Sequence, residues 1–142
     1  SVVDKSVALC RGQIRKTVES FEVHIAEDLP PIFTDSVALE QVLVNLLINA
    51  AQAVNGGNTR VMIDARRENT RQNSLIIEVS DNGCGMDERT KEMVFQPFFT
   101  TRACDNGCGL GLYISKNLID KLEGRIEVES ELGVGSTFRL IL

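Results

Sequence analysis

The stretch Gln41-Val-Leu-Val-Asn45-Leu-Leu-Ile-Asn49-Ala-Ala-Gln52-Ala53 is one of the most apolar parts of the chain, yet it repeats a carboxamide every four residues. On a helix, Gln41, Asn45 and Asn49 share one stripe. A carboxamide buried without a partner costs about 1–3 kcal/mol, so the stripe either caps neighbouring backbone in the core or lines a polar pocket. In a pocket, neutral amide oxygens are ligands that suit Mg²⁺.

The segments around this stretch alternate between helix and strand patterns. Asp35 is a good N-cap for a helix over 35–54, and Asn55-Gly56-Gly57-Asn58 ends it. A polar loop is expected over 96–108, further helices at 4–19, 87–94 and 109–122, and strands at 21–25, 60–68, 75–79, 126–131 and 136–142. Because neighbouring strands are often joined directly, this order predicts a two-layer α/β sandwich with a mixed, mostly antiparallel sheet and helices on one face.

The apolar residues of the last helix and of the final hairpin predict which sides are buried. The buried side of the helix is expected to carry Leu110, Ile114, Leu118 and Leu122. In the hairpin, the residues expected to face inward are Ile126 and Val128, and those expected to face outward are Glu127, Glu129 and Glu131.

Length and charge narrow the classes of protein. The chain has 142 residues, which suggests one domain with a sizeable core. Its formal net charge of -5 argues against nucleic acid or an anionic membrane as the main partner, and we expect no direct membrane contact by this domain. No apolar run approaches the roughly 18 residues that a membrane span needs.

The four cysteines, Cys10, Cys84, Cys104 and Cys108, do not make a disulfide scaffold, because the apolar content can build a core without cross-links. We therefore expect a reducing compartment and a cytoplasmic location for this domain. The same expectation holds whether the full-length protein that contains the domain is soluble or membrane-anchored.

The motif Asp81-Asn82-Gly83-Cys84-Gly85-Met86 closes a strand, and Asp81 lies in phase with its apolar side. A carboxylate there needs donors, and the exocyclic amine of a purine is one candidate. The glycines would let the backbone approach a flat ring closely. The alternative is an ordinary Asp-Asn-Gly turn.

The motif Gly107-Cys108-Gly109-Leu110-Gly111-Leu112 precedes and opens a helix, where free N–H groups bind phosphate. It is neither a dinucleotide-binding fingerprint nor a P-loop. Just before it, Phe95, Phe98 and Phe99 are expected to anchor the loop. Arg102 is the nearest cation, and a guanidinium suits a phosphate.

Taken in order, four blocks resemble the N, G1, F and G2 boxes of bacterial sensor histidine kinases. They are Asn45 to Asn49, Asp81 to Met86, Phe95-Gln-Pro-Phe-Phe-Thr-Thr-Arg102, and Gly107 to Leu112. The turn Gly133-Val-Gly135-Ser136-Thr137-Phe138 is similar to the last glycine-containing turn of the family. The resemblance covers roughly 20–142 and is greatest to the nitrogen-regulation type of kinase, with its short lid.

The resemblance implies the Bergerat (GHKL) ATP-binding fold, with about five strands on three helices plus a partial N-terminal helix, and ATP or ADP with Mg²⁺ as cofactors. It implies that Asn45, Asn49 and Arg102 are catalytic, with Asn49 as the ligand of Mg²⁺ and Asn45 nearby. It also implies that Asp81 accepts a hydrogen bond from the adenine amine. The residues implied to contact the nucleotide are Asn45, Asn49, Ala53, Asp81, Gly83, Gly85, Met86, Phe98, Thr100, Thr101, Arg102, Gly107, Cys108, Gly109, Leu110, Gly111, Leu112 and Thr137.

The family's phosphoacceptor is a His followed by an acidic residue and, soon after, a Pro. The only His here is His24, which lies in an expected strand and is followed by Ile25 and Ala26, so it is interpreted as structural. The chain thus resembles a catalytic domain over 20–142, with 1–19 as the end of a linker helix. The implied reaction transfers the γ-phosphoryl of ATP to a His on a missing dimerisation domain of a homodimeric kinase. A response regulator is the implied partner of that kinase.

Three alternatives stay open. One is an ATPase of the gyrase, heat-shock chaperone or mismatch-repair branch, in which a Glu four residues before the Mg²⁺-binding Asn activates water; Asn45 takes that position here and is a poor base. Another is a zinc or redox sensor built on Cys84, Cys104 and Cys108, although three thiols without a nearby His make a poor zinc site. The last is a nucleotide-binding regulatory module without catalysis.

Overall fold

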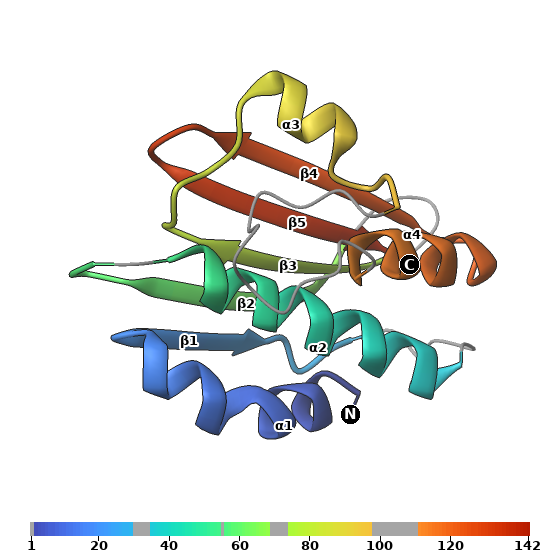
Figure 1. Ribbon diagram of the computed structural model, residues 1–142. Helices are drawn as coiled ribbons and strands as arrows, with labels where there is room; N and C mark the ends of the chain where they lie inside the picture. Colours follow the sequence, from blue (N-terminus) through green and yellow to red (C-terminus); the bar gives the residue numbers. More distant parts are fainter. Residues whose placement is uncertain (1, 30–34, 55, 69–73, 98–110) are drawn as a thin grey trace.

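The computed structural model describes residues 2–29, 35–54, 56–68, 74–97 and 111–142 (Figure 1). In chain order, the elements are α1 (Val2–Thr17), β1 (Ser20–Ile25), α2 (Ser36–Ala53), β2 (Arg60–Arg67), β3 (Leu75–Asp81), α3 (Glu88–Met93), α4 (Gly111–Lys121), β4 (Arg125–Glu131) and β5 (Gly135–Ile141). All the expected helices and strands are present, and their ends move by only a few residues.

Local sequence signals account for several of these boundaries. Asp35 caps α2, because its Oδ1 accepts hydrogen bonds from the backbone N–H of Val37 at 3.0 Å and of Ala38 at 3.2 Å. Asp87 caps α3 in the same way, accepting from the N–H of Thr90 at 2.8 Å. The predicted N-cap of the long helix is thus confirmed.

The five strands form one sheet in the order β1-β2-β3-β5-β4. The pairing of β1 with β2 is parallel, which the long crossover through α2 makes possible, and the other three pairings are antiparallel. The prediction of a mixed, mostly antiparallel sheet of five strands is confirmed. β3 lies in the centre of the sheet, which places its last residue, Asp81, between β2 and β5.

Helices α1, α2 and α4 lie on one face of the sheet, and α3 lies near its β4 edge (Figure 1). The core fills the space between the two layers. Its largest fully buried side chains include Leu39, Leu43, Leu46 and Leu47 of α2 and Ile63, Ile77 and Leu140 of the sheet. This is the two-layer α/β sandwich that the order of elements predicts.

Helix α1 is part of this core. Val3, Val7, Cys10 and Ile14 are buried, and the Cys10 thiol lies 4.0 Å from the carbonyl oxygen of Val44 on α2. The assignment of residues 1–19 to a linker helix stays a prediction; in the structure, α1 packs on the same core as the rest of the chain.

The expected buried side of α4 needs a correction. Ile114 is 40% exposed, whereas Ile119 is fully buried and Ser115 is 2% exposed. Leu118 and Leu122 do pack against the core, and Leu110 lies outside the described residues. The inward face therefore runs through Ser115 and Ile119, because a straight i, i+4 row drifts around a helix of 3.6 residues per turn.

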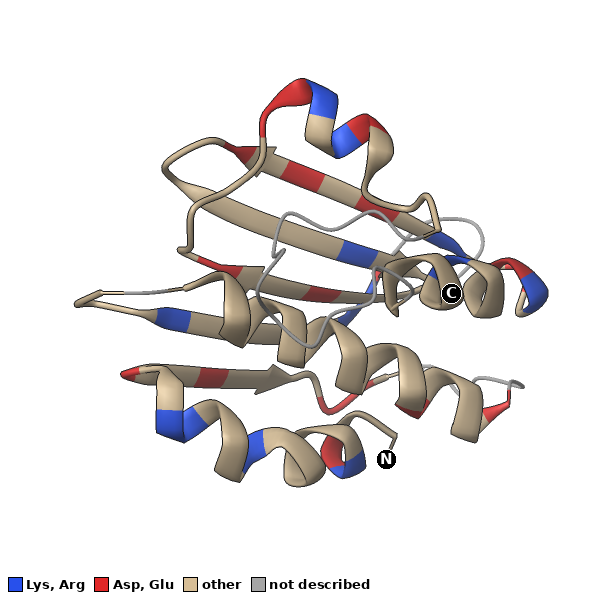
Figure 2. Cartoon of the chain, viewed as in Figure 1, with Lys and Arg blue, Asp and Glu red and all other residues tan. Residues whose placement is uncertain are grey.

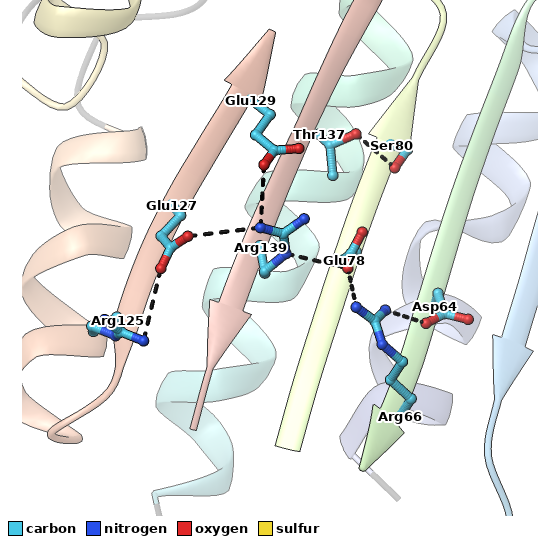
Figure 3. A network of polar contacts seen from close by, with 9 residues as sticks. All are labelled: Asp64, Arg66, Glu78, Ser80, Arg125, Glu127, Glu129, Thr137 and Arg139. Atoms are coloured by element: carbon cyan, nitrogen blue, oxygen red, sulfur yellow. Dashed lines mark hydrogen bonds and ion pairs between the residues drawn. The ribbon is translucent and has the colours of Figure 1, made fainter. Parts of the chain in front are cut away.

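The opposite face of the sheet is solvated and carries paired charges (Figure 3). Ile126 is buried and Val128 packs on the core, as expected, while Glu127 and Glu129 point to the other face and pair with Arg139. This alternation is typical of an antiparallel sheet with one wet face. None of the helices in the described ranges has both the length and the hydropathy that a membrane span needs.

Candidate functional site

Asp81 ends β3 with its side chain half-buried, on the helix-covered face of the sheet. Its Oδ1 accepts a hydrogen bond from the backbone N–H of Gly83 at 2.9 Å. Burial raises the pKa of Asp81, and hydrogen bonds from the backbone N–H groups of Gly83 and Ser136 only partly oppose this shift. A carboxylate partly removed from water is a strong acceptor for a ligand that brings an N–H donor, so Asp81 is a candidate binding residue.

The glycines beside Asp81 are required by close backbone contacts. A Cβ on Gly83 would lie 2.2 Å from the carbonyl oxygen of Ala53, and one on Gly85 would lie 2.0 Å from that of Glu131. Gly85 also has a φ of +68°, which side chains rarely adopt. The sequence predicts that these glycines let the backbone approach a ring. In the structure, their observed effect is to let this part of the backbone pack against α2 and the β4–β5 hairpin.

Hydrogen bonds fix the segment Gly83–Met86, which we call the glycine segment, on both sides. On one side, the N–H of Cys84 donates to the carbonyl oxygen of Ala53 at 3.3 Å. On the other, Gly133 donates to the carbonyl oxygen of Cys84 at 2.7 Å, and the N–H of Met86 donates to Ser130 Oγ at 2.7 Å. The structure thus brings the predicted residues Ala53, Asp81, Gly83, Gly85 and Met86 together at one end of α2.

The other end of the site lies where α2 meets the start of α4. Asn45 is half-buried, and its Nδ2 donates to the hydroxyl of Ser115 at 3.0 Å. A Cβ on Gly111, the first residue of α4, would lie 2.5 Å from Asn45 Oδ1, so only a glycine lets this helix start reach the amide. Asn45, Gly111 and Ser115 also line a groove of about 490 Å³ between α1, α2 and α4. The sequence predicts Asn45 and Gly111 as neighbours of one ligand, and the structure places them in contact.

The stripe of carboxamides joins these two ends. Asn49 lies one helical turn from Asn45 and one turn from Ala53 on α2, half-buried between them. Gln41, by contrast, is exposed and lines the groove. Helix α2 carries one charged residue, Glu40, so the stripe of carboxamides lies on a helix that is almost uncharged (Figure 2).

These residues fit a magnesium–nucleotide group. The half-buried amides of Asn45 and Asn49 supply neutral hard oxygen donors, which Mg²⁺ accepts beside phosphate oxygens and waters. Close packing of Gly111 on Asn45 places the first residue of α4 beside this amide, and a helix start favours anions. In the described part of the chain, no three His, Cys, Asp or Glu side chains gather as a metal site.

The hydroxyl of Thr137 is not at the Asp81 carboxylate. Thr137 Oγ1 lies 3.0 Å from Ser80 Oγ, and both side chains point to the solvated face of the sheet (Figure 3). Ser136, the residue before Thr137, does reach the Asp81 carboxylate, to which it donates a hydrogen bond from its backbone N–H. Strand alternation, which puts residues 136 and 137 on opposite faces, is the sequence signal that separates them.

The remaining predicted residues fall into two groups, those that the structure describes and those that lie outside the described part of the chain. Leu112 packs on the core from the first turn of α4. Phe95 does anchor its segment, with its ring edge-on to Phe138 at 6.2 Å between centroids. Cys84 is exposed. The predicted residues outside the described part are Phe98, Phe99, Thr100, Thr101, Arg102, Cys104, Gly107, Cys108, Gly109 and Leu110.

Sequence reasoning missed Ser130 and named Gly135 only as part of the last glycine-containing turn, without its contact with Asp81. Gly135 has a φ of +147°, and a Cβ there would lie 2.1 Å from the carbonyl oxygen of Asp81, so it holds β5 against the end of β3. Ser130 bonds the glycine segment across 44 positions of sequence. A glycine between two apparent strands is a visible signal; a lone serine in a strand is not.

Comparison with known proteins places this arrangement. Residues 34–142 match the sequence model of the family described as histidine kinase-, DNA gyrase B- and HSP90-like ATPase. Two relatives are the signal transduction histidine-protein kinase AtoS of Escherichia coli (strain K12), 37% identical over 142 residues, and sporulation kinase E of Bacillus subtilis (strain 168), 33% identical over 142 residues. The matches cover 100% and 99% of this chain, and the chain spans only 22% and 18% of the two relatives' lengths.

Solved structures agree. The nucleotide-free catalytic domain of histidine kinase ThkA has a TM-score of 0.82 and 30% identity, covering 99% of this chain and 89% of that one. Full-length ShkA in complex with AMPPNP has a TM-score of 0.81 and 26% identity, covering 99% of this chain and 28% of that one. ThkA in complex with the response regulator protein TrrA has a TM-score of 0.78 and 27% identity, covering 99% and 39%.

The family match covers most of the chain, and the fold match to the ThkA catalytic domain covers nearly all of both chains. The chain therefore belongs to the histidine kinase-, DNA gyrase B- and HSP90-like ATPase family, and within it to the catalytic ATP-binding domains of sensor histidine kinases, which have the Bergerat fold.

Proposed function

We propose that this domain binds Mg-ATP along α2 and donates the γ-phosphoryl group to a histidine on a separate dimerisation domain of the same kinase, from which a response regulator takes it. The observation that carries the proposal is that the predicted site residues gather at two places along α2, with Asp81 and the glycine segment at Ala53 and Gly111 at Asn45. AtoS and sporulation kinase E are named as kinases, and the ShkA structure holds a nucleotide analogue, which supports the proposal.

The spacing of these two places along α2 supports a nucleotide. Residues 45 and 53 are eight positions apart on α2, which is about 12 Å at 1.5 Å per residue. That span is on the scale of a nucleoside triphosphate laid along the helix. Asp81 and the glycine segment lie near residue 53, because Cys84 and Gly83 contact its carbonyl group, and Gly111 lies at Asn45.

Each part of the site has a role in this proposal. The Asp81 carboxylate accepts the hydrogen bond of the adenine amine, which selects adenine over a base that presents an oxygen at that place. The amides of Asn49 and Asn45, with the helix start at Gly111, position the phosphates and would hold Mg²⁺, which supplies charge neutralisation when bound. Arg102, which lies outside the described residues, is proposed to face the same phosphates.

The transfer itself needs little covalent chemistry from this domain. The bond between the γ-phosphorus and its bridging oxygen breaks, a bond forms to an imidazole nitrogen of the acceptor, and ADP leaves. The base that takes the imidazole proton would belong to the other domain. Positioning and electrostatic stabilisation are therefore what this chain contributes.

The acceptor is proposed to lie in another domain because His24 lacks the sequence context of the family's phosphoacceptor: it is followed by Ile25 and Ala26, not by an acidic residue and then a Pro. His24 lies on the edge strand β1 with its side chain 58% exposed, and its Nε2 is 3.4 Å from Glu22 Oε2 on the same strand. The dimerisation domain would precede the chain, with residues 1–19 as the connection. A homodimeric parent, a cytoplasmic position for this domain and the absence of direct membrane contact belong to the same proposal.

The test adds this domain to a separately produced, histidine-containing dimerisation domain of the parent, with γ-labelled ATP and Mg²⁺. Acid-labile label on the acceptor histidine is expected, and its loss when that histidine is replaced is the control. In parallel, calorimetry with ADP should show tighter binding with Mg²⁺ than without it. Nucleotide binding without any labelled histidine would refute the kinase proposal.

An ATPase is the second candidate, because the family that matches includes gyrase and HSP90 ATPases. In such an enzyme a carboxylate activates water near the Mg²⁺-binding asparagine, and Asn45 in that position cannot serve as a base. Its amide instead donates to Ser115. Steady ATP turnover by the domain alone that is abolished in Asn45→Ala would favour the ATPase over the kinase.

A further inference from the structure

Ser130, near the end of the edge strand β4, is the hub of a hydroxyl network beside the glycine segment. Its Oγ accepts the backbone N–H of Met86 at 2.7 Å and lies 3.0 Å from the carbonyl oxygen of Gly135 and 2.8 Å from Ser136 Oγ. A hydroxyl has one proton and two acceptor positions. If Ser130 donates to Gly135 and accepts from Met86 and Ser136, all three positions are used.

The network sits between the parts that surround Asp81. Ser136 is buried at 8% exposure, directly opposite Ser130 in the β4–β5 register, and its backbone N–H reaches the Asp81 carboxylate. The carbonyl oxygen of Gly135 accepts from Ser130, and Gly135 lies so close to the carbonyl oxygen of Asp81 that a Cβ would stand 2.1 Å from it. Ser130 thus connects the glycine segment on one side with the partners of Asp81 on the other.

The glycine segment needs such a connection. Two of its four residues are glycines, which lose more conformational freedom on ordering than any other residue. Gly133 fixes the carbonyl group of Cys84 from the hairpin, and Ser130 fixes the N–H of Met86 from the same hairpin. The second of these contacts depends on a side chain, so substitution can remove it without changing the backbone.

We propose that Ser130 is a positioning residue of the nucleotide site, which holds the glycine segment in the conformation that receives the adenine ring beside Asp81. This inference rests on the proposed nucleotide binding and deepens it. Ser130 does not touch the ligand; it acts through Met86 and, with Ser136 and Gly135, through the strand that supports Asp81. Replacing it should weaken nucleotide binding without changing the rate of phosphoryl transfer at saturation.

The variant is Ser130→Ala, with Ser130→Thr as the conservative rescue. Thr keeps the hydroxyl and is favoured in strands. The matched control is Ser6→Ala, which also removes a serine hydroxyl that donates to a backbone carbonyl, in this case the buried Ser6 Oγ at 2.8 Å from the carbonyl oxygen of Val2 on α1. Binding is measured by calorimetry with ADP and Mg²⁺ at a temperature where thermal unfolding shows every variant to be folded.

ADP affinity should fall about tenfold in Ser130→Ala, the loss expected from one to two hydrogen bonds, and stay within twofold of the wild type in Ser130→Thr and Ser6→Ala. In the transfer assay, the KM for ATP should rise by a similar factor while kcat stays unchanged. Unchanged ADP affinity in Ser130→Ala, or an equal loss in Ser6→Ala, would overturn the proposal, because a merely stabilising hydroxyl has no effect on the folded protein's affinity.

Amide hydrogen exchange of the nucleotide-free protein separates this inference from the proposed function. Exchange at Cys84 to Met86 should be faster in Ser130→Ala and normal in Ser130→Thr. If the wild type bound no ADP, the proposed function would fail, and the exchange result would still decide whether Ser130 holds the segment. Unchanged exchange at Met86 would overturn the inference even if the wild type bound ADP well.

Discussion

Two carboxylates on the same strand, Glu78 and Asp81, have opposite surroundings. Glu78 points to the solvated face, where Arg66 contacts it and Arg139 Nε lies 3.2 Å from it (Figure 3). Burial alone would raise the pKa of Glu78, but hydrogen bonds from the two arginines outweigh this effect and lower it. Asp81 points to the helix face, and its partners are backbone N–H groups, so burial prevails and its pKa is raised.

The difference separates a structural carboxylate, Glu78, from the carboxylate that we propose binds the nucleotide, Asp81. The charge of Glu78 is satisfied within the protein, in a network that extends from Asp64 to Glu129 across four strands (Figure 3). The charge of Asp81 is held partly away from water beside two sterically required glycines, a costly arrangement that is typical of functional sites. Changes at Asp81 and the glycine segment should therefore alter ligand binding, and changes around Glu78 should alter stability alone.

The largest effect is expected from Gly83→Ala. The new Cβ would lie 2.2 Å from the Ala53 carbonyl oxygen, so the backbone beside Asp81 must move. We expect a loss of roughly 2 kcal/mol in the free energy of unfolding and more than about 30-fold in ADP affinity, measured by denaturant unfolding and calorimetry.

Gly57→Ala is the matched control, since a Cβ there meets nothing within 4 Å. It should change the free energy of unfolding by less than about 0.5 kcal/mol and leave ADP binding unaltered. Equal behaviour of the two variants would show that the close contact at Gly83 does not shape the site.

The next effect is a pH dependence of opposite sign for the two carboxylates. Since the pKa of Asp81 is raised in the folded state, that residue's contribution to stability is full below its unfolded pKa and is lost as pH rises through the folded pKa. The contribution of Glu78, whose pKa is lowered, is present above its unfolded pKa and is lost as pH falls through the folded pKa.

In the proposed site, binding of adenine requires the ionised form of Asp81. ADP affinity should thus fall as pH drops through its raised pKa, by about tenfold per pH unit once below it. Calorimetry over a pH series measures the dependence, with Arg139→Gln expected to keep the wild-type profile. A profile in Asp81→Asn identical to that of the wild type would assign the dependence to another group.

The smallest effect is expected on the Glu78 side. Arg139→Gln removes the cation between Glu78, Glu127 and Glu129, and its pairs are partly exposed, so we expect a loss of about 1 kcal/mol in stability. Arg125→Gln is the control, because Arg125 is 71% exposed and its distance to Glu127 is 3.9 Å. ADP affinity should stay within twofold in both; a larger loss in Arg139→Gln would mean that the two carboxylates are coupled.

The sequence predicts most of the fold because local rules act within each element. The capping of α2 by Asp35 and the alternation in β4 and β5 follow from neighbouring residues alone. The inward phase of Asp81 follows from the same alternation. The family resemblance predicts which of these residues contact the same ligand. Hydrophobic periodicity alone cannot predict this.

What the sequence could not predict depends on contacts between distant parts. The parallel pairing of β1 with β2 and the packing of α1 on α2 arise only when separate elements meet. The inward face of α4 differs from the prediction at Ile114, because Ile114 and Ile119 are equally apolar and packing on α2 and β4 decides which of them is buried. The proposed role of Ser130 depends on a partner, Met86, that lies 44 positions away.

The central claim, that Asp81 recognises adenine, is tested most directly by the affinities of ADP and GDP for the wild type and for Asp81→Asn. Asn keeps an oxygen for the Gly83 N–H but adds a donor that suits the oxygen of guanine. The account predicts that the wild type prefers ADP by at least about tenfold and that Asp81→Asn, while folded and at least as stable, loses or reverses this preference. Equal binding of ADP and GDP by the wild type, or an undiminished preference for ADP in Asp81→Asn, would contradict it.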